Sequence, residues 1–318
     1  MTMLAADPDY APAVALVPDR LAELAKLVSP ETVLRADEPL AKRTTLRVGG
    51  GAEWYAEPAS ELDLAALVQW CSRQKLPFFI LGRGSNLLVR DGGIRGLVIC
   101  LAHPCFSRID AVGNHLVCGA GAKLKAVAME ARRRELTGLE FLEGIPGTVG
   151  GALRMNAGAM GCWTFDVVES IRYMDRAGGV HEAEAREVPV EYRSCPLLLD
   201  HIALGAVLKG HPASREVVDQ RLKAFNKKRW ESQPAAPSAG CIFKNPVLIP
   251  AGKLIDELGL KGTRVGQAMV SHEHGNFIVN EGTATAREVL ELIEIIRQRA
   301  RQERGIELAT EVEIVGEN

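Results

Sequence analysis

The sequence predicts an α+β protein with more than one domain, and three observations support this. Near the N-terminus, a strand–helix–strand pattern ends in a glycine-rich loop. From about residue 97 to 210, short β-rich runs alternate with glycine turns around one helix. The last segment closes with an amphipathic helix and an alternating strand. A chain of 318 residues, 47% of them hydrophobic, is long enough to build two or three cores.

The first elements follow one another closely. Glu53–Pro58 has the composition of a short strand ended by proline. Ser60 then predicts a helix N-cap, with Asp63 three residues on and an apolar stripe that continues to about residue 74. Pro77–Leu81 predicts a second strand, which runs directly into Gly82–Asn86. This is one β-α-β-like unit that ends in a glycine loop.

The middle of the chain holds further β-rich runs, one helix and a second glycine loop. The helix is predicted at about Lys123–Glu135, and the loop, Gly144–Gly151, reads GIPGTVGG. The β-rich runs are Leu97–Leu101, His115–Cys118, Val167–Tyr173 and Ile202–Leu208.

The C-terminal third has the clearest helix signal. Residues 214–230 are predicted to be helical and lead into the proline-bearing segment 233–237, a candidate domain boundary. Thr285 and Glu288 form a capping box that starts an amphipathic helix. The closing run 308–315 alternates as a strand does, with apolar and acidic residues on opposite faces.

Composition and cysteine spacing exclude several classes of function. The formal net charge is -2 and no long run of Lys or Arg occurs, so no nucleic-acid partner is predicted. The seven cysteines form no CxxC and no Cys/His cluster with zinc spacing, so we expect no metal. Dispersed thiols, the lack of an export signal and the lack of a stretch of about 18 apolar residues predict a cytoplasmic protein without membrane insertion.

The two glycine loops are the candidate ligand-binding features. Glycines let backbone amides approach an anion closely, and Ser85 and Asn86 add side-chain donors to the first loop. A single short glycine loop is more often only a turn. The spacing is neither GxGxxG opening a helix nor GxxxxGK[ST], so a Rossmann site and a P-loop are both disfavoured. Two such loops in one domain fit a dinucleotide whose two phosphates are held from opposite sides.

Six segments of the sequence, taken in order, resemble a known family. They read LGRGSNLLVRDGGIRGLVI, GLEFLEGIPGTVGGALRMNAGAMG, VEYRSCPLL, PSAGCIFKNP, AGKLIDELGLKG and TEVEIVG. In this order they resemble UDP-N-acetylenolpyruvoylglucosamine reductase, over about residues 38–316. Each motif is modest alone, but the combination is specific.

The resemblance implies an FAD-binding domain of the vanillyl-alcohol-oxidase-like type in two subdomains, followed by an α/β substrate domain. It implies noncovalent FAD, with NADPH as the hydride donor. The implied division is an FAD-binding domain, 31–212, with subdomains of about 31–100 and 101–212, and a substrate domain, 213–318. An N-terminal extension, 1–30, precedes them, and its first residues, to about 16, are rich in Ala, Pro and Asp and are predicted to form a loosely held tail. The implied FAD-binding residues are Arg47, Leu81, Gly82, Arg83, Gly84, Ser85, Asn86, Gly144, Ile145, Pro146, Gly147, Gly150, Gly151, Asn156 and Gly158.

The family's reaction reduces UDP-N-acetylglucosamine enolpyruvate to UDP-N-acetylmuramate in peptidoglycan synthesis. It needs a cation near the enolpyruvyl carboxylate, an acid above C2 and groups that stabilise the intermediate. The resemblance assigns the cation to Arg193 and the carboxylate near the intermediate to Glu311. Without the family resemblance, we would interpret Arg193 as part of a surface ion pair and Glu311 as a residue on the solvent-exposed face of an edge strand. The implied substrate contacts are Tyr192, Lys244, Asn245 and Arg264.

Cys241 departs from the family pattern, which usually has a serine proton donor at this position. It lies in a Gly-flanked turn, which we expect to precede a short strand and to present the side chain to a cleft. A thiol with an ordinary pKa of about 8.5 is mostly protonated near neutral pH and can give a proton without activation. The alternative for Cys241 is a packing thiol.

The link from Pro246 to Ala251 is short, whereas the family's longer type has an insertion here with a substrate-clamping tyrosine. The resemblance is therefore to the shorter type, and we expect a monomer or weak oligomer with a small UDP-sugar substrate. Two alternatives stay open: an FAD-dependent oxidase of the same fold acting on an alcohol or sugar lactone, and a UDP-sugar or flavin binding module without catalysis. The first glycine loop lacks the histidine that binds flavin covalently in many such oxidases.

Overall fold

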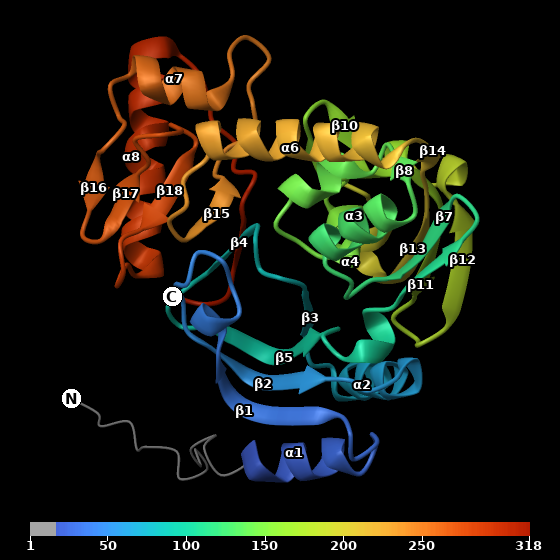
Figure 1. The fold of residues 1–318 in the computed structure, drawn as a ribbon. Coiled ribbons are helices and arrows are strands. Elements are labelled where there is room, and N and C mark those ends of the chain that lie inside the picture. The colour runs from blue at the N-terminus through green and yellow to red at the C-terminus, as the bar shows by residue number, and fades with distance from the viewer. Residues whose placement is uncertain (1–16) are drawn as a thin grey trace, which may run out of the picture.

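The computed structural model describes residues 17–318, so the predicted tail, 1–16, lies outside the described residues. Figure 1 shows three parts: a sheet with helices at the bottom, a second sheet at the upper right and a helix-rich part at the upper left. Each part has its own cluster of buried apolar side chains. No helix in the described range combines the length and the apolar character needed to cross a membrane.

The first subdomain is a four-stranded sheet that confirms the predicted strand–helix–strand unit. Strands β2 and β3 both run parallel to β5, which lies between them. The sequence pattern missed β1, the antiparallel edge strand, because its VLRADEP sequence is charged and mostly exposed. The bounds are α1 Val17–Ala25, β1 Val33–Pro39, η2 Leu40–Lys42, β2 Gly51–Glu57, α2 Glu61–Gln74, β3 Phe78–Leu81, β4 Leu87–Val89 and β5 Ile94–Cys100.

The predicted N-cap of α2 is confirmed and anchors the preceding chain. The Ser60 hydroxyl accepts a hydrogen bond from Asp63 N at 3.1 Å. The buried Asp63 carboxylate in turn accepts from Ser29 N and Oγ at 2.9 Å each, and from Thr32 Oγ1 at 3.0 Å. Burial by itself would raise the pKa of Asp63, but these hydrogen bonds outweigh it and hold the pKa below its ordinary value.

Asp63→Ala is therefore expected to lower the free energy of unfolding by about 2 kcal/mol at neutral pH, because partly buried donors lose their acceptor. The contribution is present above the unfolded-state pKa of about 3.9 and is lost as pH falls through the lower folded-state pKa. Denaturant unfolding at several pH values measures it. Asp110→Ala, at an exposed site of the second subdomain, is the control and should have little effect. A difference between wild type and Asp63→Ala that persists unchanged at low pH would contradict this account.

The second subdomain is a five-stranded antiparallel sheet in the order β12-β11-β13-β7-β6. Three of the predicted β-rich runs form its central strands, and the predicted helix is α3. The bounds are η3 Pro104–Phe106, β6 Ile109–Val112, β7 His115–Gly119, α3 Leu124–Arg133, β8 Leu136–Thr137, η4 Glu140–Gly144, α4 Val149–Arg154, β9 Gly158–Ala159, β10 Cys162–Trp163, η5 Thr164–Asp166, β11 Val168–Met174, β12 Val180–Glu184, η6 Ala185–Glu187, α5 Leu197–Asp200, β13 Ile202–Lys209 and β14 His211–Pro212.

Helix α6 (Arg215–Ser232) confirms the helix predicted over 214–230 and runs from the second subdomain toward the C-terminal domain (Figure 1). Its packing is with the second subdomain, because Phe225 lies against that core and Arg132 of α3 pairs with Asp219. The boundary after residue 212 stays a prediction. The packing of α6 favours the proline-bearing segment 233–237 as the division instead.

The C-terminal domain is a four-stranded antiparallel sheet covered by helices. The capping box of Thr285 and Glu288 that begins α8 is confirmed. Leu46 and Val48 of the first subdomain pack into this core, and Asn280 Nδ2 donates to Leu46 O at 3.1 Å. The bounds are β15 Ser238–Cys241, α7 Ala251–Glu257, β16 Arg264–Val265, β17 Ala268–Val270, β18 Phe277–Asn280, α8 Ala286–Arg304 and β19 Glu313–Val315.

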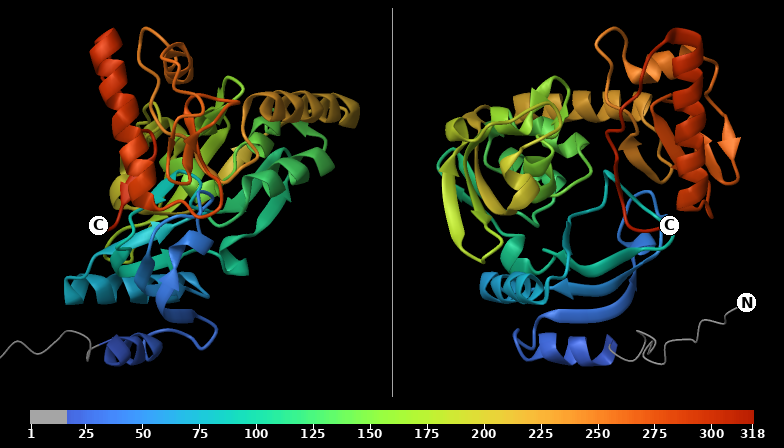
Figure 2. Two further views of the ribbon diagram at one scale, coloured as in Figure 1. Left: turned by 90° about the vertical axis from the view of Figure 1, so that its left-hand side faces the viewer. Right: turned by 180° about the vertical axis from the view of Figure 1, so that it is seen from behind.

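The strand predicted over 308–315 needs correction. Only β19 (Glu313–Val315) is a strand, and it pairs in parallel with β4 of the first subdomain. The preceding residues cross between the domains, where Glu311 N donates to Ile242 O at 2.8 Å. Figure 2, seen from behind, shows this last segment descending to the first subdomain. The chain end therefore ties the domains together and carries Glu311 into their junction.

Candidate active site

Arg193 and Glu311 form an ion pair at this junction. The Arg193 Nε–Glu311 Oε1 distance is 2.7 Å, and the side chains are only 19% and 10% exposed. Arg193 has a φ of 59°, a left-handed conformation that a non-glycine residue adopts at a cost. Its Nη1 is buried and has no hydrogen-bond partner within the described part of the chain. The turn thus holds one unsatisfied guanidinium donor, which suits an anionic oxygen of a ligand.

Two aromatic rings restrict the guanidinium of Arg193. Its Cζ lies 5.1 Å from the centroid of Trp163 and 5.3 Å from that of Tyr192. The two rings meet edge to face at 5.7 Å. Tyr192 was predicted as a site residue, whereas Trp163 was missed because it is 29 positions away in sequence from Tyr192 and no motif marks it.

Glu311 is a buried carboxylate among cations. Burial raises its pKa, and the neighbouring Arg193 and Lys244 oppose that rise without reversing it. Asn86 of the first glycine loop donates from Nδ2 to Glu311 O at 3.0 Å. The reading of Glu311 as the wet face of an edge strand is therefore wrong.

Cys241 lies in the same junction, where both charges of the ion pair affect the pKa of its thiol. Burial raises the pKa of its thiol to about 12; Glu311 adds to the rise and Arg193 opposes it. The expectation of an ordinary thiol pKa is thus corrected, and the thiol stays protonated well above neutral pH. The position is corrected too: Cys241 ends strand β15 directly after Gly240, whose φ is 75°, and no strand follows it at once.

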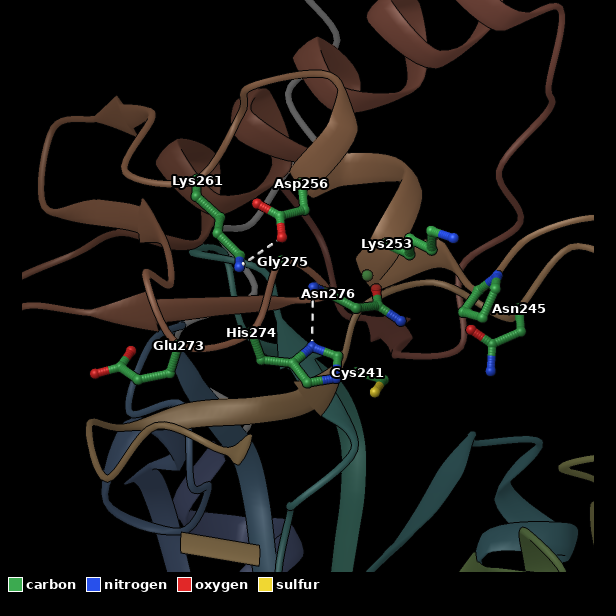
Figure 3. A pocket seen from close by; sticks show the side chains of 11 residues that line it. Cys241, Asn245, Lys253, Asp256, Lys261, Glu273, His274, Gly275 and Asn276 are labelled. Carbon is green, nitrogen blue, oxygen red and sulfur yellow. Dashed lines mark hydrogen bonds and ion pairs between the residues drawn. The ribbon is translucent and has the colours of Figure 1, made fainter. Parts of the chain in front are cut away.

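A cleft of about 340 Å³ opens beside Cys241 (Figure 3). Asn245, Lys253, Lys261 and His274 contribute to its lining. Burial lowers the pKa of His274, as does nearby Lys261, and His274 Nδ1 accepts from Asn276 N at 3.1 Å. The cleft therefore combines two lysines and a neutral imidazole with the carboxylates of Asp256 and Glu273. Lys261 Nζ pairs with Asp256 at 2.9 Å, so the lining is polar and of mixed charge. The motif reading missed Lys253, Lys261 and His274, since only the fold brings them to Cys241.

The two glycine loops lie against each other. A Cβ placed on Gly82 would lie 3.0 Å from Thr148 Oγ1, and one on Gly147 would lie 3.8 Å from Ser85 Oγ. Gly84 has a φ of 61°, and a Cβ there would approach the Thr44 backbone to 2.8 Å, so only glycine fits. The predicted pairing of the loops is therefore confirmed.

A second cavity, of about 220 Å³, lies beside these loops. It is lined by residues of both, including Arg83 and Gly147, and by three further cations, Lys123, Lys125 and Arg229. The buried Thr44 Oγ1, close to Gly84, has no hydrogen-bond partner among residues 17–318. Basic side chains, close-approach glycines and an unsatisfied hydroxyl fit the phosphates of a dinucleotide.

Several predicted residues have local structural roles. The Asn156 side chain donates to Glu191 O at 3.4 Å and accepts from Phe165 N at 3.2 Å, so it supports the turn that carries Arg193. Gly158 makes room for Trp163, because a Cβ would come within 2.5 Å of that ring. Asn245 Oδ1 accepts from Ala251 N at 3.0 Å, which ties down the short link.

Two predicted residues do not join the cluster. Arg264 lies on β16, separated from β15 by β17 and β18, and it pairs with Glu281 instead. Its position does not support the predicted contact with substrate. Arg47 is exposed, with its carbonyl accepting from Asn280 Nδ2 at 3.4 Å. Its predicted contact with FAD stays a prediction.

Comparisons with known proteins agree with this geometry. Residues 52–184 match the profile of an FAD binding domain, so FAD is the cofactor of this chain. Residues 233–315 match the profile described as UDP-N-acetylenolpyruvoylglucosamine reductase, C-terminal domain. A crystal structure of the reductase from Thermus caldophilus superposes with a TM-score of 0.77 at 37% identity, covering 89% of this chain and 98% of that one.

Curated relatives carry the same name. The UDP-N-acetylenolpyruvoylglucosamine reductase of Magnetococcus marinus is 42% identical over 282 residues, which covers 87% of this chain and 90% of the relative. That of Caldanaerobacter subterraneus is 40% identical over 301 residues, covering 94% and 98%. The sequence similarity covers both profile matches and nearly the full length of this chain and of each relative. The chain therefore belongs to the UDP-N-acetylenolpyruvoylglucosamine reductase family.

Proposed function

We propose that this enzyme reduces UDP-N-acetylglucosamine enolpyruvate to UDP-N-acetylmuramate, the step that precedes muropeptide assembly in peptidoglycan synthesis, with NADPH as the hydride donor. The observation that carries the proposal is the buried Nη1 of Arg193, which has no hydrogen-bond partner in the described part of the chain. Glu311 holds the same guanidinium through Nε, beside a protonated thiol. A substrate carboxylate needs that cation, and its neighbouring carbon needs that proton.

The glycine loops are proposed to hold FAD without a covalent bond. The first loop, Gly82–Asn86, and the second, Gly144–Gly151, would contact the two phosphates, and Arg83 is the cation that the first loop itself supplies. Leu81 ends the strand that delivers the first loop. When bound, FAD supplies the hydride, taken from NADPH, that reaches C3 of the enolpyruvyl group.

Arg193, Glu311 and Cys241 are proposed as the catalytic residues. Arg193 binds the enolpyruvyl carboxylate and stabilises the negative charge that develops there as hydride arrives at C3. Glu311 holds the guanidinium in place through its Nε. The Cys241 Sγ–H bond breaks as a C–H bond forms at C2, and the thiolate left behind is reprotonated from solvent. The raised thiol pKa keeps the donor in its protonated form before each turnover.

The remaining polar residues are proposed to bind the UDP-sugar. Tyr192 and Lys244 face Glu311 closely enough to affect its pKa, so they lie at the reacting end. Asn245 and Lys253 line the 340 Å³ cleft beside Cys241 and would bind polar groups of the substrate, whereas Lys261 of the same cleft is paired with Asp256. All these segments come from one chain, which is compatible with a monomer or weak oligomer. Free cysteines throughout the described range are compatible with a cytoplasmic location.

Purified protein is expected to be yellow and to release free FAD on denaturation by heat or acid. NADPH should bleach the flavin absorbance under anaerobic conditions, and UDP-N-acetylglucosamine enolpyruvate should restore it. Stopped-flow absorbance measures both half-reactions. The rival oxidase would be bleached by an alcohol or sugar lactone instead of NADPH. A colourless protein that cannot be reconstituted with FAD would contradict the proposed function.

A further inference from the structure

A second ion pair involves Glu313, two residues along the chain from Glu311. Arg154, at the end of α4, makes a two-pronged contact with Glu313 of β19, with Nη1–Oε2 and Nη2–Oε1 distances of 2.7 and 2.9 Å. The two side chains are 35% and 31% exposed, so the pair by itself contributes little to stability. Its geometry is bidentate, which gives directional control beyond simple attraction.

Arg154 also contacts the chain segment that carries Arg193. Its carbonyl oxygen accepts a hydrogen bond from Cys195 N at 2.9 Å. Cys195 follows Arg193 by two positions, and Glu313 follows Glu311 by two positions. One residue therefore holds both chain segments that carry the ion pair, one through its backbone and the other through its side chain.

Asn86 completes this support from the first glycine loop. Its Nδ2 donates to Glu311 O at 3.0 Å, and its carbonyl accepts from Glu313 N at 3.0 Å. Removing the side chain of Arg154 would leave the backbone of residues 311–313 held by Asn86, by Ile242 and by the pairing of β19 with β4, but would free the Glu313 carboxylate. The segment that carries Glu311 then loses the side-chain contact that α4 makes with it two residues further along the chain.

We propose that Arg154 is a positioning residue that sets the Arg193–Glu311 geometry through its bidentate contact with Glu313. The inference rests on the proposed function for its kinetic readout, and it assigns to two residues outside the catalytic set a role in the substrate half-reaction. A rival role is a simple tie between domains. The molecule offers a control, because Arg172 of β11 makes a bidentate contact with Glu61 of α2 at 3.0 and 3.1 Å. Its Nε also pairs with Glu182 at 3.2 Å, so its loss removes at least as many ionic contacts as the loss of Arg154.

The test compares Arg154→Ala with Arg172→Ala in the FAD-loaded protein. Arg154→Ala should slow flavin reoxidation by UDP-N-acetylglucosamine enolpyruvate about tenfold or more, since small misplacements of reacting groups are costly. Reduction by NADPH should change by no more than about twofold, and thermal stability should fall no further than in Arg172→Ala. Exchanging the two charges gives a second test. Arg154→Glu and Glu313→Arg should each slow flavin reoxidation by the substrate, and the double variant should regain most of the wild-type reoxidation rate.

A second readout does not depend on turnover. The Nε–H signal of Arg193 in heteronuclear NMR, identified by its absence in Arg193→Lys, should report the bond to Glu311 in wild type and shift in Arg154→Ala. If wild type is not reoxidised by this substrate, the proposed function fails, and the NMR signal still tests Arg154. If Arg154→Ala does not fold, Glu313→Gln carries the same test from β19. Equal reoxidation rates in the Arg154 and Arg172 variants, or an unmoved Arg193 signal, would overturn the inference.

Discussion

Arg193→Ala is expected to slow reoxidation of the reduced flavin by UDP-N-acetylglucosamine enolpyruvate by about a hundredfold or more, the scale for loss of one electrostatic stabiliser. The loss is expected only in the half-reaction in which the reduced flavin transfers hydride to the substrate. The buried Nη1 has no hydrogen-bond partner among residues 17–318, so its donor capacity is available to the charge that develops on the substrate carboxylate. Reduction by NADPH builds no such charge at this point and should survive largely intact.

The control for this prediction is Arg264→Ala. Both arginines were predicted from sequence as site residues, but Arg264 pairs with Glu281 at the opposite edge of the C-terminal sheet. Its loss should leave both half-reactions close to wild type. Stopped-flow absorbance of the two variants separates the roles. If Arg193→Ala lost both half-reactions equally, the result would indicate damaged FAD binding, and a slow Arg264→Ala would show that the domains rearrange on substrate binding.

Local sequence signals predicted the elements that depend on local interactions. The N-cap at Ser60 and the capping box at Thr285 could be predicted from the sequence because a cap and its partner lie three residues apart. The two glycine loops were readable as loops, and their mutual contact is confirmed. The site residues Arg193, Cys241 and Glu311 came from the family resemblance, since each residue alone has a commoner structural explanation. The structure brings these three together, and their roles stay proposals.

Long-range pairing was not readable from the sequence. The closing run looked like a strand of its own domain, but its partner β4 is more than two hundred residues earlier. Strands β17 and β18 are short and fully buried on both faces, so they lack the alternation that predicts a strand. The acidity of Cys241 was also hidden, because burial and the nearby Glu311 carboxylate set it, and both are products of the fold.

Cys241→Ala is expected to keep its flavin and its reduction by NADPH, yet to lose about 10²–10⁴-fold in reoxidation by substrate, because a missing general acid costs on that scale. Cys241→Ser should remain an active reductase, since a hydroxyl can donate a proton from the same place. For a thiol that only packs, the order reverses: alanine is mildly destabilising, and a buried hydroxyl is often worse.

Cys71 is the matched control. Burial raises the pKa of its thiol to about 12, as in Cys241, but Cys71 lies wholly in the core of the first subdomain. Cys71→Ala and Cys71→Ser should change stability and leave reoxidation at the wild-type rate. The comparison separates the effect of a high thiol pKa from the effect of a position beside the cleft.

The pH dependence and thiol reactivity follow from the same environment. With a thiol pKa of about 12, ionisation of Cys241 should cause no loss of reoxidation between neutral pH and about pH 10. Only about 10⁻⁵ of the thiol is ionised at pH 7, so alkylation should be slow there and should accelerate about tenfold per pH unit. Bound substrate should protect against it. The order of the two variants decides the role: if Cys241→Ala outperforms Cys241→Ser in substrate-driven reoxidation while both hold FAD, Cys241 is a packing residue and the proton comes from elsewhere.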